Sequence, residues 1–183
     1  ILLIPICISS CGTGTLESDT DGMSPAPVPV VKIDPHQVGT LAREIVHDNI
    51  IRRFILYVPD SYDRNTPTPL LFNFHGYGGN AEQQMNYGDF RSIADNEGFL
   101  ILHPQGTRLP STGSTHFNVG GWTRGSNIDD VGFTNYLINV ISRLYNIDEL
   151  KNFSTGMSNG GFMSYELACK LSARIAGIAS VTG

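Results

Sequence analysis

One pentapeptide constrains the fold of this 183-residue chain more than any other stretch. Residues 156–160 read Gly-Met-Ser-Asn-Gly, a G-x-S-x-G pattern with a short strand-like run before it and a helix-like run after it. In this context the serine occupies a strained strand-to-helix turn, and its hydroxyl projects from the edge of the sheet. Glycines are expected at both flanks because a Cβ would collide with the neighbouring strand or helix. The pattern therefore predicts Ser158 as a nucleophile.

A second glycine motif supports this interpretation. Alone, the pentapeptide is a weak signal in a chain with 20 glycines, where it could be a turn with an incidental serine. Upstream, however, residues 70–79 form an apolar strand that runs into His-Gly-Tyr-Gly-Gly. In α/β-hydrolases such a loop supplies one backbone N–H of the oxyanion hole. The helix after Ser158 also directs its N-terminus, which favours an anion, at the same place. The two motifs in this order predict a serine hydrolase.

Alternating strand and helix signals predict the fold class. Strands are expected at 41–47 and 51–58, as an antiparallel hairpin at the sheet edge, and buried strands at 70–74, 99–103 and 175–182. Helices are expected at 81–97 with a break near Gly88, at 129–146, and after Ser158. This alternation is typical of an α/β fold, a mostly parallel sheet with helices on both faces. The ligand site should lie at the carboxyl ends of the strands, where both glycine motifs fall.

Two features between these elements have alternative interpretations. Residues 109–128 form a long polar loop, and such loops are usually functional or disordered. The loop holds the only tryptophan, Trp122, which could line a substrate cleft or be a hydrophobic plug under the loop. Asp129 and Asp130 invite a catalytic interpretation, but acidic residues at a helix start cap free N–H groups and oppose the helix dipole. Capping is the favoured interpretation of both.

The N-terminal 36 residues are expected to lie outside the folded domain. Residues 1–11 are apolar until Ser-Ser-Cys and are similar to a secretory signal that ends in a bacterial lipobox, with Cys11 as the lipidated residue. An ordinary signal cleaved nearby is the alternative. Residues 12–36, rich in Pro, Ser, Thr and Gly, predict a disordered tether. Residues 37–183 would then be the N-terminal part of a hydrolase domain, secreted and lipid-anchored at the bacterial outer membrane or cell surface.

Composition excludes several kinds of partner. The net charge of −5 leaves no basic patch for nucleic acid. No run approaches the roughly 18 apolar residues of a membrane span, so membrane contact is expected only through the lipid anchor. No His/Cys/Asp cluster has metal-ligand spacing, and residues 76–79 open no dinucleotide-binding unit, so neither a metal nor a cofactor is expected.

Cys169 is expected to be a small buried hydrophobe, or else disulfide-bonded to a cysteine outside this sequence.

The chain offers its serine no obvious base. A serine nucleophile needs one, normally a histidine oriented by a carboxylate. All five histidines precede Ser158, and the only later carboxylate is Glu166. His103 ends a strand, and His116 lies in the polar loop, which the sequence suggests is mobile. His75 belongs to the oxyanion loop, where its expected role is to shape the loop by hydrogen bonding. The base and its carboxylate are therefore expected beyond Gly183, and this chain alone is expected to be inactive.

Four segments together resemble the secreted esterases grouped with polyhydroxybutyrate depolymerases and with feruloyl or acetylxylan esterases. They are Ile-Leu-Tyr-Val-Pro at 55–59, His-Gly-Tyr-Gly-Gly-Asn at 75–80, Asp-Asp-Val-Gly-Phe at 129–133 and Thr-Gly-Met-Ser-Asn-Gly-Gly-Phe-Met at 155–163. The similarity runs from about Gly39 to the end. It implies an α/β-hydrolase fold, Ser158 as nucleophile, and an oxyanion hole made by the backbone N–H groups of Tyr77 and Asn159 beside Gly76.

The resemblance implies acyl transfer from an ester to water. The expected substrates are polyesters or the ester groups of plant-type polysaccharides, and the sequence does not distinguish between them. One alternative is a serine peptidase on the same fold, which a comparison of ester and amide turnover would separate. Another is a non-catalytic, lipid-anchored binding protein on a hydrolase scaffold, which a downstream sequence without a suitable histidine would favour.

Overall fold

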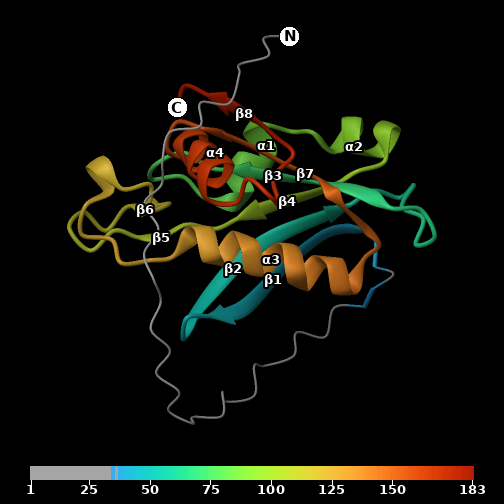
Figure 1. Cartoon of the computed structure of the whole chain (residues 1–183), viewed down its shortest axis with the longest axis horizontal. Helices are drawn as coiled ribbons and strands as arrows, with labels where there is room; N and C mark the ends of the chain where they lie inside the picture. The colour runs from blue at the N-terminus through green and yellow to red at the C-terminus, as the bar shows by residue number, and fades with distance from the viewer. Residues whose placement is uncertain (1–33, 36) are drawn as a thin grey trace.

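The computed structural model describes residues 34, 35 and 37–183 (Figure 1). The predicted signal with Cys11, and nearly all of the predicted tether, lie outside the described residues. The described part begins just before the first strand of the predicted hydrolase domain.

One six-stranded sheet organises the described chain, with the strand order β1-β2-β4-β3-β7-β8. Strands β3, β4, β7 and β8 are parallel to their neighbours in this group, whereas β2 is antiparallel to both β1 and β4. The strand bounds are β1 Gly39–His47, β2 Ile50–Val58, β3 Thr68–Phe74, β4 Leu100–Pro104, β7 Ile147–Met157 and β8 Gly177–Val181. The mostly parallel α/β sheet predicted from the sequence is confirmed.

The predicted hairpin at the sheet edge is confirmed as β1 and β2. Their register pairs Gly39 with Val58 and His47 with Ile50, so only Asp48 and Asn49 form the turn. Both turn residues have positive φ, 50° and 59°. This left-handed pair matches the twist of the strands and is most easily adopted by residues such as Asp and Asn.

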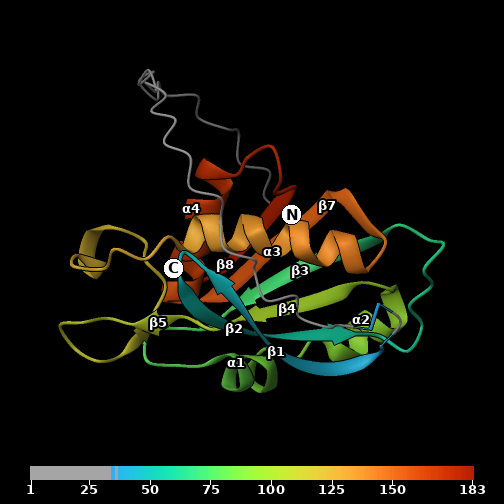
Figure 2. The ribbon, with the colours of Figure 1, turned by 90° about the horizontal axis from the view of Figure 1, so that it is seen from below.

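Four helices cover the two faces of the sheet. Figure 2 shows α3 and α4 on one side of the strands and α1 and α2 on the other. Their bounds are α1 Ala81–Tyr87, α2 Arg91–Glu97, α3 Asp130–Leu144 and α4 Asn159–Lys170. The predicted break near Gly88 is confirmed, because Gly88 ends α1 and its N–H donates to the Gln84 carbonyl oxygen. Coverage of both faces leaves the carboxyl ends of β3 and β7 as the open end of the sheet.

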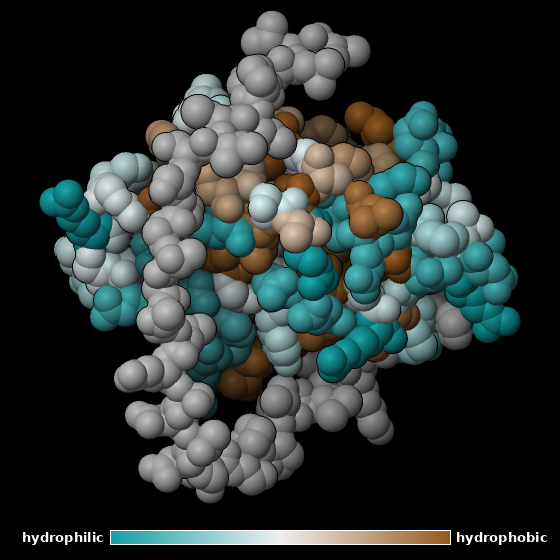
Figure 3. Space-filling model, viewed as in Figure 1, coloured by the Kyte–Doolittle hydropathy of each residue, from teal (hydrophilic) through white to brown (hydrophobic). Residues whose placement is uncertain are grey.

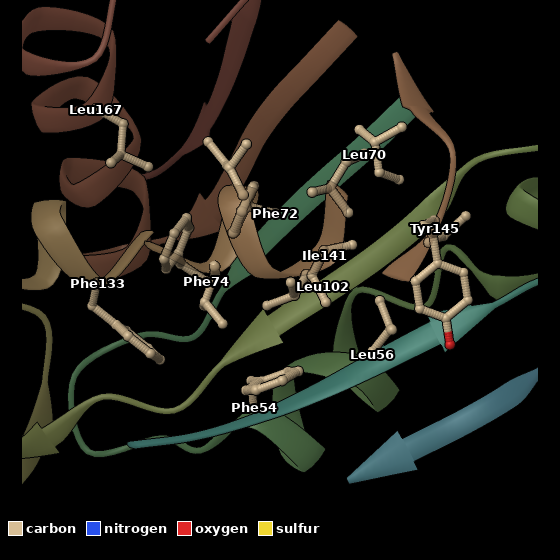
Figure 4. Close-up of a cluster of buried hydrophobic side chains, with 14 of the residues drawn as sticks. Phe54, Leu56, Leu70, Phe72, Phe74, Leu102, Phe133, Ile141, Tyr145 and Leu167 are labelled. Carbon is tan, nitrogen blue, oxygen red and sulfur yellow. The ribbon is translucent and has the colours of Figure 1, made fainter. Parts of the chain in front are cut away.

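The core lies between α3, α4 and the sheet, where aromatic and aliphatic side chains interdigitate (Figure 4). On α3 the buried apolar residues include Phe133, Leu137 and Ile141. Full burial of each such side chain stabilises the fold by about 1.5–3 kcal/mol. Val131 and Tyr136 of the same helix are half-buried and pack against this core.

Two burial predictions near the end of the chain are wrong. Cys169, expected to be buried, is exposed on α4. Residues 175–182 were expected to form a strand covered on both faces, but Val181 of β8 is 49% exposed. Strand β8 is the outermost strand of the described sheet, with β7 on one side only. Its apolar composition therefore reflects contact with β7 and α4 rather than full enclosure.

The surface of the described residues carries both polar and apolar side chains. On the face shown in Figure 3, hydrophilic and hydrophobic side chains are interspersed. Across the described ranges, the search for a helix both long and apolar enough to cross a bilayer finds none.

Candidate active site

Ser158 occupies a sharp turn between β7 and α4. Its backbone lies at φ 51° and ψ −114°, a conformation that a residue with a side chain rarely adopts. The Ser158 N–H donates to the Val181 carbonyl oxygen at 2.8 Å, which ties the turn to β8. The side chain is half-buried, and its hydroxyl makes no hydrogen bond to any other described residue. The hydroxyl is therefore open to an incoming group.

The two glycines of the pentapeptide are required by close backbone approach. A Cβ on Gly156 would lie 2.5 Å from the Gly160 carbonyl carbon and 2.8 Å from the Phe74 carbonyl oxygen. A Cβ on Gly160 would lie 2.6 Å from the Phe74 carbonyl carbon and 2.8 Å from the His75 carbonyl oxygen. These are backbone atoms that cannot rotate away. The predicted collision with the neighbouring strand and helix is confirmed.

The loop after β3 lies directly against this turn. A Cβ on Gly76 would be 3.7 Å from the Ser158 Cβ and 3.3 Å from the Met157 Cε. The next residue, Tyr77, and the first residue of α4, Asn159, have backbone N–H groups that donate to no acceptor among the described residues. Free N–H groups are normal at the start of a helix. Both predicted oxyanion donors thus lie next to residues at the turn and are unoccupied by the protein.

His75 is buried under the loop and connects three segments. Its Nε2 accepts the Gly106 N–H at 3.0 Å, so the ring proton lies on Nδ1, which donates to the Gly76 carbonyl oxygen at 2.7 Å. The ring packs on Phe117 with a centroid distance of 4.6 Å. Burial lowers the pKa of His75 to about 4, which keeps the ring neutral at ordinary pH. Both ring nitrogens are engaged with the backbone and neither bonds Ser158.

The predicted long polar loop is more ordered than expected. Its first part forms a small two-stranded ladder, β5 Thr107–Arg108 with β6 Thr115–His116, and a 3-10 turn, η1, follows at Gly121–Thr123. The ladder holds the oxyanion loop, because the Gly78 N–H donates to the Thr115 carbonyl oxygen at 2.8 Å. His116, expected in a mobile loop, is fully buried, with its Nδ1 2.9 Å from the Thr107 carbonyl oxygen. The expectation of mobility for His116 is wrong.

The side chain of Asn159 joins the polar loop to the start of α4. Its Oδ1 accepts the Phe117 N–H at 2.7 Å, and its Nδ2 donates to the Phe117 carbonyl oxygen at 3.0 Å. Asn159 is fully buried. Phe117 in turn packs edge-on against Phe74 at 5.0 Å. The residue after Ser158 therefore has a structural contact that the pentapeptide alone does not reveal.

The paired aspartates at the start of α3 have different roles. Asp129 caps the helix as predicted, since its Oδ1 accepts the Gly132 N–H at 2.7 Å. Asp130 does not cap. It is 2% exposed, its Oδ1 accepts from Arg52 Nη2 at 2.5 Å, and its Oδ2 accepts the Asn118 N–H at 2.7 Å. The capping interpretation of Asp130 is wrong, because its carboxylate is occupied by Arg52 and the Asn118 N–H. The sequence did not reveal this, since Arg52 lies on β2, 78 residues away.

Trp122 lies in an exposed row of three aromatic side chains. Its ring contacts Tyr77 edge-on at 5.5 Å and Phe162 at 6.4 Å. Trp122 is 51% exposed, so it is not a plug under the loop. Tyr77 follows the oxyanion-loop glycine, and Phe162 lies one helical turn after Ser158. Sequence reasoning missed Phe162, which lies in the first turn of α4 and whose backbone N–H donates to the Ser158 carbonyl oxygen at 3.0 Å.

No described group acts as an evident base or metal site beside Ser158. None of the described histidines hydrogen-bonds its hydroxyl.

Away from this region, His47, Asp48 and Asp129 bring ligand-type atoms within 4.8 Å of one another, a cluster that sequence spacing did not reveal. The His47 Nε2 lies 3.5 Å from the Asp48 Oδ2, and Asp129 caps α3. We assign these residues no metal.

The proteins similar to this chain include feruloyl and acetylxylan esterases. No family model matches the chain. A probable feruloyl esterase C of Aspergillus clavatus is 31% identical over 149 residues, which cover 79% of this chain and 50% of that protein. A bifunctional acetylxylan esterase/xylanase of Neocallimastix patriciarum is 27% identical over 128 residues, 70% of this chain and 17% of that protein. The chain spans about half the length of the feruloyl esterases it matches.

Solved structures agree on the fold. The acetyl xylan esterase from Aspergillus awamori superimposes with a TM-score of 0.55 at 18% identity, covering 72% of this chain and 47% of that one. An S-formylglutathione hydrolase from Agrobacterium tumefaciens superimposes with a TM-score of 0.62 at 17% identity, covering 77% of this chain and 56% of that one. At these identities the likeness concerns the architecture of the sheet and its helices.

Proposed function

Since this chain is an α/β-hydrolase of the feruloyl and acetylxylan esterase group, we propose that the whole protein is a serine carboxylic-ester hydrolase with Ser158 as nucleophile. One observation carries this proposal. An unpartnered serine hydroxyl stands on a turn with positive φ, next to a glycine loop, and the flanking backbone N–H groups of Tyr77 and Asn159 have no acceptor in the described chain.

The mechanism proposed is acyl transfer in two steps. The Ser158 Oγ attacks the ester carbonyl carbon while its proton passes to a base, and the Tyr77 and Asn159 N–H groups hold the resulting oxyanion. The C–O bond to the alcohol then breaks, the base returns the proton to the alcohol, and an acyl-serine remains. Water, deprotonated by the same base, releases the acid and restores Ser158. Each oxyanion donor contributes about 3 kcal/mol of transition-state stabilisation.

The base and its carboxylate are proposed to follow Gly183 in the full-length protein. In α/β-hydrolases the order along the chain is serine, acid, histidine. The histidines that the structure describes are all upstream, and His75 is held by two backbone groups. The coding sequence beyond Gly183 tests this directly. An aspartate or glutamate and then a histidine, each in a loop after a strand, are expected; a reading frame without a histidine contradicts the proposal.

The row of Tyr77, Trp122 and Phe162 is proposed as the surface that receives the acyl group. Aromatic rings pair edge-on or offset, and each such contact contributes about 0.5–1.5 kcal/mol beyond area burial. A row of exposed rings beside Ser158 suits an aromatic acyl group better than an acetyl group. The names of the curated relatives include feruloyl and acetylxylan esterases. We therefore favour aromatic esters of plant-type polysaccharides, with polyesters as the less favoured substrate.

Replacement of the nucleophile in the full-length protein tests the function. Ser158→Ala should reduce hydrolysis of 4-nitrophenyl ferulate and 4-nitrophenyl acetate by at least 10³-fold, because no other group can form the acyl intermediate. Ser172→Ala, at an exposed serine just after α4, is the matched control and should keep wild-type rates. Circular dichroism checks that both variants are folded. Substantial esterase activity in folded Ser158→Ala would exclude the proposed nucleophile.

A further inference from the structure

The segment that carries Trp122 is held at its base by a partly buried network of polar groups. Asn118 organises this network: its Nδ2 donates to the carbonyl oxygens of Ser126 and Ile128, at 3.2 and 2.9 Å, and its Oδ1 accepts from Thr123 Oγ1 at 3.3 Å. Thr123 Oγ1 also lies 2.7 Å from the Gly120 carbonyl oxygen. These contacts close residues 118–128 into one unit, which presents Trp122 outward.

Two anchors connect this unit to the rest of the protein. The first is the paired hydrogen bonding between Asn159 and the backbone of Phe117, which joins the unit to the turn of Ser158. The second is Asp130, whose Oδ2 accepts the Asn118 N–H at 2.7 Å. Asp130 is itself fixed by Arg52, and both residues are 2% exposed.

The side chain of Arg52 is held in place by Phe133 and Asp130. Its guanidinium lies 3.9 Å above the Phe133 ring, and its Nη2 donates to Asp130. A buried ion pair is weak evidence for net stability, because replacing it with apolar side chains is often neutral or favourable. Its geometric effect is more informative here. One carboxylate oxygen is held by β2 and the other holds the loop, so the carboxylate sets the distance between the sheet and the Trp122 unit.

We propose that Asp130, held by Arg52, is a positioning residue for acyl-group specificity: it fixes the Trp122 unit so that the ring stands beside Tyr77 and Phe162 at the nucleophile. This inference rests on the proposed esterase function. Asp130 does not touch the reacting atoms. It acts through Asn118, so its loss affects the binding of an aromatic acyl group more than that of an acetyl group.

The test measures substrate preference in the full-length protein. The readout is the ratio of kcat/KM for 4-nitrophenyl ferulate to that for 4-nitrophenyl acetate, which share a leaving group. Trp122→Ala is the reference variant, because it shows how far the ratio falls when the ring itself is lost. The expected fall is about three- to tenfold. Asp130→Asn should reproduce most of that fall through a higher KM for the ferulate, because an amide cannot accept from both Arg52 and Asn118.

A double variant separates positioning from stability. Asp130→Asn leaves Arg52 buried without its counter-charge and could fail to fold. Arg52→Met combined with Asp130→Leu removes both charges and should remain folded, yet it also lacks the acceptor for the Asn118 N–H. The ferulate-to-acetate ratio should stay low in this variant although its thermal stability is restored. A folded double variant with the wild-type ratio would overturn the proposal.

The controls distinguish the possible failures. Asn139→Ala, which removes the acceptor of Arg174 Nη2 elsewhere on α3, should keep the wild-type ratio. Thr123→Val loosens the same network without touching the ion pair and should lower the ratio. If Trp122→Ala lowers the ratio and neither Thr123→Val nor the double variant does, the positioning proposal is wrong while the esterase stands. Activity that persists in Ser158→Ala instead refutes the underlying function.

Discussion

At the scale of single residues, the turn at Ser158 requires glycines, because it leaves no room for a Cβ on either side. Gly160 lies so close to the end of β3 that a Cβ would overlap the backbone of Phe74 and His75. A side chain there would push α4 away from the sheet and move the Asn159 N–H with it. The glycine at position 160 therefore sets both the packing of α4 on the sheet and the position of the Asn159 N–H.

Gly160→Ala should be strongly disruptive. Overpacking of a site bounded by backbone costs about 1–3 kcal/mol, and the displaced N–H should reduce kcat more than it changes KM. Gly177→Ala is the matched control on β8, because a Cβ there would lie 3.4 Å from the Phe153 ring at ordinary contact distance. Urea unfolding and esterase assays on the full-length variants give both quantities. Equal behaviour of the two variants would contradict the close-approach argument.

Two buried histidines predict a pH dependence of stability. Burial lowers the pKa of His75 and of His103 to about 4, whereas an unfolded histidine titrates near 6.5. Between these values the unfolded chain binds more protons. Stability is therefore fully present above about pH 6.5 and falls as the pH drops toward 4, by about 3 kcal/mol for each histidine. Urea unfolding at several pH values measures the slope, and His75→Gln should remove about half of it.

At the scale of elements, the start of α3 shows two aspartates that look alike in sequence and differ in effect. Asp129 satisfies the N–H of Gly132, whereas Asp130 is enclosed between Arg52 and Asn118. The first contact is local to the helix. The second connects the helix to β2, the strand next to the edge strand β1, and to the loop before the helix.

Alanine at each position should separate these roles. Asp129→Ala should lower the free energy of unfolding by about 1 kcal/mol, the usual effect of a lost N-cap. Asp130→Ala should lower it by about 3–5 kcal/mol, because the Arg52 charge is left buried without a partner. Denaturant titration of the two full-length variants is sufficient. A larger effect at Asp129 would mean that both residues act mainly as caps.

Asp129 and Asp130 show that contacts with neighbours in the chain could be predicted from the sequence, whereas contacts formed by the fold could not. The turn at Ser158, the break near Gly88 and the cap at Asp129 depend on neighbours in the chain, so residue type and spacing revealed them. The Arg52–Asp130 pair, the exposed position of Cys169 and the row of Tyr77, Trp122 and Phe162 depend on residues brought together by the sheet. A single sequence shows the glycine motifs of the candidate site, but not which side chains meet around them.

At the scale of the whole molecule, the sequence before the described sheet differs in composition from the rest of the chain. Residues 12–36 have the composition of a tether, and Cys11 follows Ile-Ser-Ser. We propose that the domain is secreted and held at a bacterial surface by a lipid on Cys11, where it would meet polymeric esters outside the cell.

Removal of the lipid acceptor tests this localisation. With the native precursor expressed in a bacterial host, Cys11→Ser should abolish incorporation of labelled palmitate and move the protein from the membrane fraction to the soluble one, since acyl chains supply the membrane affinity. Cys7→Ser, within the expected signal, is the control and should remain membrane-bound. Labelling that survives in Cys11→Ser would rule out this anchor.

The hydrogen bond from the Ser158 N–H to the Val181 carbonyl oxygen also bears on the order of events during translation. Chains fold as they emerge from the ribosome, with N-terminal parts first. The pentapeptide leaves the exit tunnel before α4 and β8, so at that moment its nitrogen lacks the acceptor that β8 supplies. A nascent chain arrested within α4 would carry the nucleophile without its geometry. Reactivity toward a serine-directed phosphonate probe should therefore be absent until both β8 and the downstream base proposed above have emerged.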